Sequence, residues 1–115
     1  TSNVLEIRAG GSDLIRFDGN NGKVIVESNL EPDADNSYNL GSSTKRWANI
    51  HSADLQLSNE GTEGNDVDGT TGNWTLQEGE EDIFLINNKT GKKYSIMLKE
   101  VKQWQTIKSL QSSMT

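Results

Sequence analysis

Histidine is the side chain that most often carries acid–base catalysis at neutral pH, and this 115-residue chain contains one, His51. No nucleophile or second base accompanies it at the spacing of a known catalytic arrangement. It falls on the apolar side of an expected strand, so packing explains it better than catalysis. We therefore predict no enzyme and no catalytic residue.

Carboxylates are concentrated in the acidic segment 78–82, which contains Glu78, Glu80, Glu81 and Asp82. Such groups bind hard cations such as Ca²⁺, and a pair of them hydrolyses glycosides when a cleft holds them at a fixed separation. Sequence neighbours on one turn do not provide that cleft, and their spacing follows no metal-binding rule. We interpret the segment as a solvated turn that discourages pairing between sheet edges.

Two stretches rich in Asp, Asn and Gly, residues 18–22 and 66–69, echo a calcium-binding loop. The second has Gly64 where an EF-hand loop needs its leading Asp, and the first is one residue too short. Gly10 and Gly11 also lack the strand–loop–helix context of a phosphate site. We therefore expect turns here, and predict no metal and no cofactor.

The charge of the chain bears on its partners. The formal net charge is −6, whereas contacts with phosphates need Lys and Arg, so no nucleic-acid partner is expected. No apolar run approaches the ~18–20 residues of a membrane span, which predicts no membrane insertion. The chain also has no cysteine, so it has neither a disulfide nor a thiol site.

Period-two alternation predicts the strands that must position these side chains. In the first part of the chain we expect strands at residues 4–8, 14–17 and 23–27, joined by turns rich in Gly and Asn, as a β-meander. After a polar connection around Pro32, the alternation resumes over residues 51–57, and we expect a fourth strand there.

The later part of the chain predicts a three-stranded module. Strands are expected at residues 73–77, 83–87 and 92–98, with the last two forming a hairpin around residues 88–91. A type I turn followed by Gly91 in the left-handed region, which forms a G1 bulge, suits that loop.

This turn sets the expected register of the hairpin. It places Ile86 opposite Tyr94 and Phe84 opposite Ile96, which gathers apolar residues on one face. A plain four-residue loop would instead place Ile86 across from Lys93, and we expect the first register.

The predicted fold class is all-β, built from short-strand meanders and a β-hairpin. Val101, Trp104, Ile107 and Leu110 recur every three residues, which suits either a short C-terminal helix or a tail. The expected segments are a shaft-like meander at 1–60, a Gly/Asp-rich loop at 61–72, the three-stranded module at 73–100 and the tail or helix at 101–115.

The apolar content is low, at 31% of residues with 11 glycines in addition. Globular domains usually reach ~45–50% with glycine counted, so we do not expect one copy to build a sufficient core. Long disorder is disfavoured, because the chain has a single proline and its aliphatic residues cluster in short runs. The composition therefore predicts that copies of the chain share their apolar residues.

One segment resembles a known repeat: Tyr38-Asn39-Leu40-Gly41-Ser42-Ser43-Thr44-Lys45-Arg46-Trp47-Ala48-Asn49-Ile50. It is similar to the "Tyr-Asp-Leu-Gly-Ser-Ser-x-x-Arg-Trp-x-x-Ile" unit of bacteriophage tail-fibre proteins. Ser42 or Ser43 could cap a single helical turn that carries Trp47. The alternative is an irregular loop that turns Leu40, Trp47 and Ile50 inward.

A second stretch, residues 68–94, resembles a distal domain of such fibres, particularly those of marine and cyanobacterial phages. Together the two stretches cover about half of the chain. The resemblance implies a homotrimeric virion fibre of intertwined or side-by-side β-elements that contacts other tail proteins and a host-surface glycan or protein. The candidate trimer-packing residues are Leu40, Trp47, Ile50, Trp74, Phe84, Ile86, Tyr94 and Ile96.

Loops on rigid scaffolds carry binding functions, so Asp66, Asp68, Glu78 and Glu80 are the candidate receptor-facing residues. The expected function is a structural component of a phage tail fibre, located in the virion, that supports attachment to the host cell. The alternatives are another virion fibre or trimerisation module without receptor binding, and a fibre-associated enzyme that degrades polysaccharide.

Overall fold

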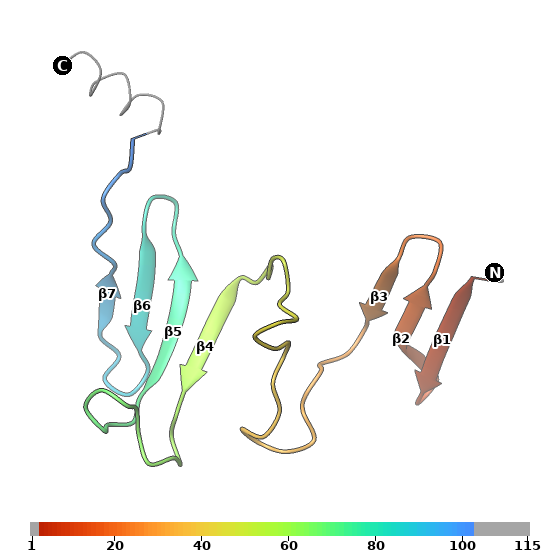
Figure 1. Cartoon of the computed structure of the whole chain (residues 1–115), viewed down its shortest axis with the longest axis horizontal. Helices are drawn as coiled ribbons and strands as arrows, with labels where there is room; N and C mark the ends of the chain where they lie inside the picture. The colour runs from red at the N-terminus through yellow and green to blue at the C-terminus, as the bar shows by residue number, and fades with distance from the viewer. Residues whose placement is uncertain (1–2, 103–115) are drawn as a thin grey trace. The chain divides into compact units, whose positions relative to one another are not determined.

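The computed structural model describes residues 3–102, which form seven strands and no helix (Figure 1). The strands belong to two antiparallel sheets, which confirms the all-β class. The chain divides into two units, Thr1–Ala48 and Asn49–Thr115, each with one sheet. The C-terminal helix considered for residues 101–115 lies almost wholly outside the described residues.

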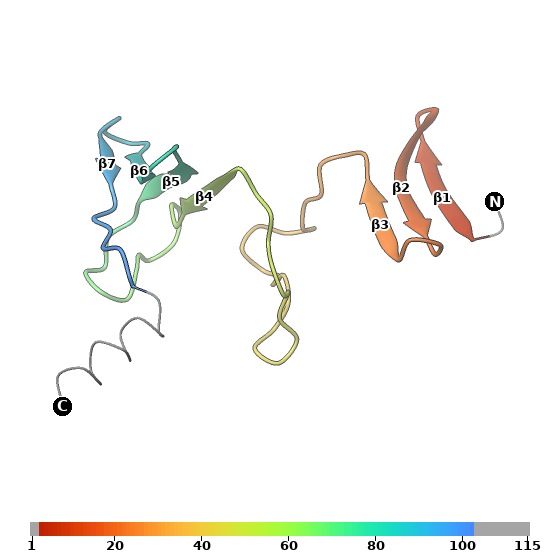
Figure 2. The same cartoon turned by 90° about the horizontal axis from the view of Figure 1, so that it is seen from above.

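The first sheet is the predicted meander. Its strands are β1 (Val4–Ala9), β2 (Ser12–Asp18) and β3 (Lys23–Val26), in the order β1-β2-β3 (Figure 2). Gly10 and Gly11 join β1 to β2 with φ angles of 62° and 82°, which are accessible to glycine at no steric cost. The predicted strand segments are therefore correct here.

The first sheet has one apolar face. Leu5, Phe17 and Val24 form one row across its three strands, and Ile7, Ile15 and Val26 form the next. The opposite face carries Glu6, Arg16 and Asp18 among its residues. This alternation is the period-two pattern that predicts the strands.

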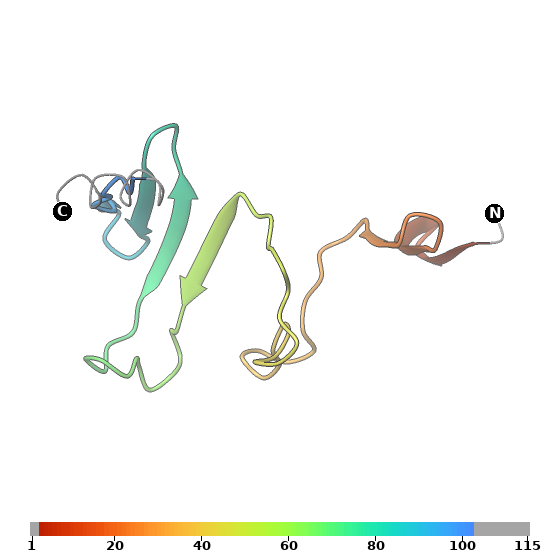
Figure 3. The ribbon, with the colours of Figure 1, turned by 45° about the horizontal axis from the view of Figure 1, so that its top comes forward.

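The second sheet has four strands: β4 (Asp54–Ser58), β5 (Asn73–Glu78), β6 (Ile83–Asn87) and β7 (Lys93–Ser95). Their order is β4-β5-β6-β7, and Figure 3 shows β4 running alongside β5. The sheet is therefore larger than the three-stranded module expected from residues 73–100. The extra strand is β4, which we had grouped with the segment 1–60 and which pairs with β5 over its whole length.

The β6–β7 hairpin has a different register from the predicted one. Ile86 lies opposite Lys93, so its predicted pairing with Tyr94, and that of Phe84 with Ile96, is wrong. The observed register is that of the plain four-residue loop, which we had considered the less favourable alternative.

Hydrogen bonds made by Asn87 explain this register. Its N–H donates to Lys92 O at 2.9 Å, and its carbonyl accepts the Gly91 N–H at 2.8 Å. Its side-chain Oδ1 also accepts the N–H groups of Lys89 and Thr90. Gly91 is left-handed as predicted, with φ 75°, but a left-handed glycine serves both the three-residue and the four-residue loop, so it could not decide between them.

The observed register gives the second sheet one wholly apolar central row, which crosses all four strands as Leu55, Leu76, Leu85 and Tyr94. Four neighbours share this side of the sheet. We call these eight residues the apolar face of the second sheet; the neighbours are Leu57, Trp74, Ile83 and Ile96.

Within residues 3–102 no apolar side chain is buried, and Thr75 is the one buried residue, with 6% of its surface exposed. Each sheet is a single layer in its own unit, with one apolar face and one polar or mixed face. Such a face normally packs against a second layer. Neither unit supplies that layer from its own described residues.

Candidate functional site

The motif segment folds as an irregular loop with a tight turn, not as a helical turn. Ser42 N–H donates to Lys45 O at 3.0 Å, and Lys45 N–H donates to both the carbonyl and the hydroxyl oxygen of Ser42. Gly41 precedes the turn with φ 81°. A Cβ there would lie 3.0 Å from Lys45 O and 3.4 Å from Trp47 Cδ1. The distance to Lys45 O is tighter than an ordinary contact, whereas that to the indole is ordinary, so the motif needs glycine for its conformation and for the close approach of the Lys45 carbonyl.

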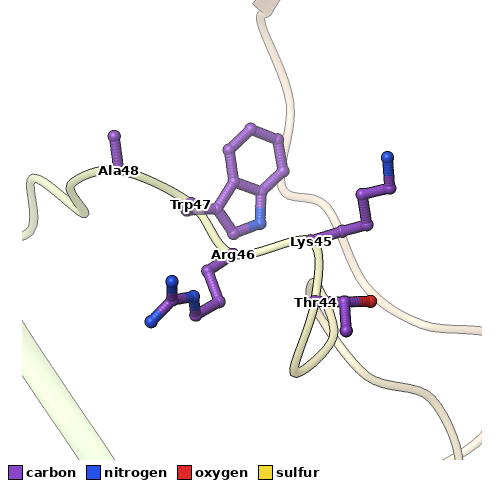
Figure 4. Close-up of a pocket in the computed structure, with 5 residues that line it drawn as sticks. All are labelled: Thr44, Lys45, Arg46, Trp47 and Ala48. Carbon is purple, nitrogen blue, oxygen red and sulfur yellow. The ribbon is translucent and has the colours of Figure 1, made fainter.

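The residues that follow this turn are presented outward. Figure 4 shows the Trp47 indole with Lys45 and Arg46 extending on different sides of the chain. Trp47 is 62% exposed, and Leu40 and Ile50 are 76% and 75% exposed. The expectation that the segment turns these three residues inward is therefore not met within one chain.

The remaining trimer-packing candidates belong to the second sheet, and the structure divides them between its two faces. Trp74 and Tyr94 lie on the apolar face, with their ring centroids 5.8 Å apart. Ile96 shares that face, whereas Phe84 and Ile86 lie on the opposite one. The predicted grouping of Phe84 and Ile86 with Tyr94 is wrong, because it depended on the incorrect hairpin register.

The face that carries Phe84 and Ile86 also holds a polar network that the sequence reasoning missed. The Thr75 hydroxyl donates to Gln56 Oε1 at 2.7 Å and accepts from Asn88 Nδ2 at 3.0 Å. Asn88 Nδ2 also donates to Asn73 Oδ1 at 2.9 Å. The signal available in the sequence was the run of alternating polar residues in β4 and β5. The polar groups of this network therefore satisfy one another within the sheet.

The loop between β4 and β5 is closed by its own side chains. Asn59 Oδ1 accepts the Gly72 N–H at 2.7 Å, which joins the two ends of the loop. Inside it, Asn65 Nδ2 donates to Asp68 Oδ1 at 2.8 Å, and that oxygen also accepts the hydroxyl and the N–H of Thr70. These bonds lower the pKa of the Asp68 carboxyl below its ordinary value of 3.8, with the Asn65 amide as the main cause.

The tip of this loop projects Val67, which is 96% exposed. Its N–H donates to Asn65 Oδ1, as does that of Asp68, so the backbone holds the tip while the Val67 side chain is free. Val67 is a candidate contact residue that the sequence reasoning missed. Asp66, one of the predicted receptor-facing residues, is its exposed neighbour.

The predicted receptor-facing residues do not form one surface. The loop with Asp66 and Asp68 joins β4 to β5, whereas Glu78 ends β5 and Glu80 lies in the β5–β6 turn, at the other end of the sheet (Figure 1). The hairpin loop 88–91 shares the first end, where Lys89 Nζ lies 3.9 Å from Glu60 Oε1 and donates to Thr71 Oγ1.

The acidic turn is tight and exposed. Gly79 N–H donates to Asp82 O at 2.7 Å, and a Cβ at Gly79 would lie 2.5 Å from Phe84 Cε2. No group of three acidic or histidine side chains within residues 3–102 is placed to hold a metal ion.

His51 precedes β4, which begins at Asp54, three residues later than the predicted strand. Its expected position on the inward face of a strand is therefore wrong, and the residue is exposed.

The described residues 3–102 contain no helix with the length and apolar character of a membrane span. The chain matches no protein-family model, and no significantly similar protein is found among curated proteins or solved structures.

Proposed function

We propose that this chain is a structural module of a bacteriophage tail fibre, that it works as a homotrimer, and that it supports attachment of the virion to the host cell surface. The proposal assigns it no catalytic role. Its location would be the virion, and its other partners would be neighbouring tail proteins.

The observation that carries the proposal is that no apolar side chain is buried among the residues that the structure describes. Nineteen large apolar side chains among residues 3–102 are at least 36% exposed. This number approaches the ~20–30 residues that each partner contributes to a stable protein interface. Copies of the chain would cover these side chains and also pair or protect the open edges of both sheets.

The resemblance of residues 38–50 and 68–94 to tail-fibre sequences favours a virion fibre over other trimeric adhesins. Gly41, which is part of the repeat pattern, supplies the left-handed conformation before the motif turn and leaves room for the Lys45 carbonyl. This arrangement gives the repeat a structural purpose and involves no reactive group.

The end of the second sheet that carries loops 59–72 and 88–91 is the best candidate for contact with a host receptor. A three-copy fibre would present three such ends, so weak individual contacts would reinforce one another. The exposed Val67 and Asp66 are the residues that we expect to touch the receptor.

The test is the native mass of the chain at micromolar concentration by light scattering, followed by a bacterial glycan array. We expect about three times the chain mass of 12.7 kDa. Array binding should be reduced at least tenfold in the double variant Asp66→Ala/Val67→Ala and unchanged in the control Glu80→Ala. A cooperatively folded monomer would overturn the proposal. A trimer that binds no glycan on the array would instead favour a fibre or trimerisation module without this receptor role.

A further inference from the structure

The apolar face of the second sheet is exposed in a single chain, and this exposure points to a specific contact surface. Its central row, Leu55, Leu76, Leu85 and Tyr94, contains no polar side chain except the Tyr94 hydroxyl. Leu55 is 50% exposed and Tyr94 is 46% exposed. Leu76 and Leu85 between them are half-buried, so a monomer in water would leave the row partly solvated along its length, which is unusual for a soluble sheet.

The two faces of this sheet have opposite requirements. The face with Gln56, Thr75 and Asn88 satisfies its polar groups internally, and Thr75 is already buried there. Among its eight residues, the apolar face has only the Tyr94 hydroxyl and the Trp74 indole N–H as side-chain polar groups, and it lacks cover. This side of the sheet therefore gains more from a partner than the side with the polar network, where Phe84 is 36% exposed.

No described residue of the same unit covers the apolar face. The strand register places Phe84 and Ile86 on the opposite face of the sheet. Ile50 and Met97 lie outside the strands and are 75% and 98% exposed. The cover must come from elsewhere.

We infer that this apolar face packs against the same face of other copies of the chain, with the central row of Leu55, Leu76, Leu85 and Tyr94 at the contact, while the polar network points away from it. This inference rests on the proposed homotrimer and specifies which surface makes it.

The apolar face supplies part of the interface that the proposed homotrimer needs. Burying a large apolar side chain removes on the order of 100 Å² of surface from water. Eight partly exposed side chains bring roughly 300–400 Å² per copy, so two such faces in contact remove roughly 600–800 Å², and other exposed apolar residues of the chain have to supply the rest of the ~1,000 Å² expected of a biological interface.

Charge favours identical copies as the occupant. The chain carries a net charge of −6, so copies repel one another in general. All eight residues of the apolar face are uncharged, and the one carboxylate of β5 on this side, Glu78, is exposed at the end of the strand. Copies can therefore meet at the central row without burying a carboxylate there.

A matched pair of variants on one strand tests the assignment. Tyr94 and Ser95 are neighbours on β7 that point to opposite faces, and both are exposed. We expect Tyr94→Glu to reduce the native mass threefold, to that of one chain, and Ser95→Glu to leave it unchanged. Far-UV circular dichroism checks that both variants keep their sheet content.

Hydroxyl-radical footprinting of the unmodified chain provides a measurement that needs no substitution. Packing of the apolar face predicts that Tyr94 and Trp74 become at least fivefold less reactive at micromolar than at nanomolar concentration, while Phe84 does not change. The opposite pattern, in a chain of trimeric mass, would overturn the face assignment and leave the trimer intact.

A monomeric mass for the unmodified chain would overturn both the inference and the proposed function. If Tyr94 were protected in that monomer, the cover would be another segment of the same chain, such as the first sheet or residues 103–115.

Discussion

At the scale of single residues, Gly41 shows how a motif can be specified by backbone conformation and close contact together. Its φ of 81° is unfavourable for L-residues, and a Cβ there would also crowd Lys45 O, at 3.0 Å. Gly61 has nearly the same φ, 80°, but an added Cβ there would meet nothing within 4 Å. Comparing Gly41 with Gly61 therefore separates the cost of left-handed strain from the cost of crowding a neighbouring atom.

We predict that Gly61→Ala lowers the free energy of unfolding by about 1 kcal/mol, through strain alone. Gly41→Ala should lower it by roughly 1 kcal/mol more, because the Lys45 carbonyl must also give way. Urea unfolding at fixed protein concentration measures both values. Equal effects would mean that the close approach of Lys45 O to Gly41 contributes nothing.

Asp68 makes the loop 59–72 sensitive to acid. Hydrogen bonds from Asn65 and Thr70 lower its pKa in the folded loop relative to the ordinary 3.8. A carboxyl with a lowered pKa stabilises the fold above its unfolded-state pKa, and that contribution disappears as the pH falls through the folded-state value. Acidification below about pH 4 should therefore open this loop.

Hydrogen exchange of the Thr70 N–H, which donates to Asp68 Oδ1, reports on this opening. We expect its protection to fall below pH 4 by more than the general pH effect on neighbouring amides. Asp68→Asn should remove this additional dependence, because the amide does not titrate. A variant that keeps the same acid response would assign it to another carboxyl.

At the scale of elements, the buried Thr75 hydroxyl links β4, β5 and the hairpin loop through Gln56 and Asn88. Thr75→Val keeps the shape of the side chain but leaves both amides without this partner. We expect a loss of about 1–2 kcal/mol in unfolding free energy. Thr75→Ser, which keeps the hydroxyl, should restore the Asn88 contact, and two-dimensional NMR of the amide side chains would show it.

The hairpin register can be checked by cross-linking, because the chain has no native cysteine. The double variant Ile86→Cys/Lys93→Cys places two cysteines opposite each other, and we expect it to form a disulfide on mild oxidation. Ile86→Cys/Tyr94→Cys should not, because in the observed register these positions point to opposite faces. Thiol titration after oxidation distinguishes the two variants, and the reverse result would restore the G1-bulge register.

Much of the element pattern follows from the sequence. Alternation located the strands of the meander and of β5 and β6, because each has one apolar face. It could not give the β6–β7 register, since Gly91 suits two loop lengths and the deciding bonds come from Asn87. Alternation also could not predict that β4 pairs with β5 across a 14-residue loop. It could not show that Asp68 and Glu80 lie at opposite ends of the second sheet.

At the scale of the whole molecule, folding and association are expected to be coupled, because each unit lacks a buried apolar core among its described residues. Mass action then makes the thermal midpoint rise with protein concentration. We predict an increase of several degrees between 1 and 100 μM for the unmodified chain and none for Tyr94→Glu. Differential scanning fluorimetry over a dilution series measures it, and a midpoint independent of concentration would argue for a self-sufficient monomer.

The hydrogen bonds within loop 59–72 determine which of its residues can change without loss of the fold. Asn59, Asn65 and Asp68 fix the backbone, while the Val67 side chain takes part in none of these bonds. Substitutions at the tip should therefore be tolerated without loss of fold. Under the proposed attachment role, point mutations there would change which receptor is bound. Randomising positions 66 and 67 while keeping the three fixing residues would give a library for retargeting.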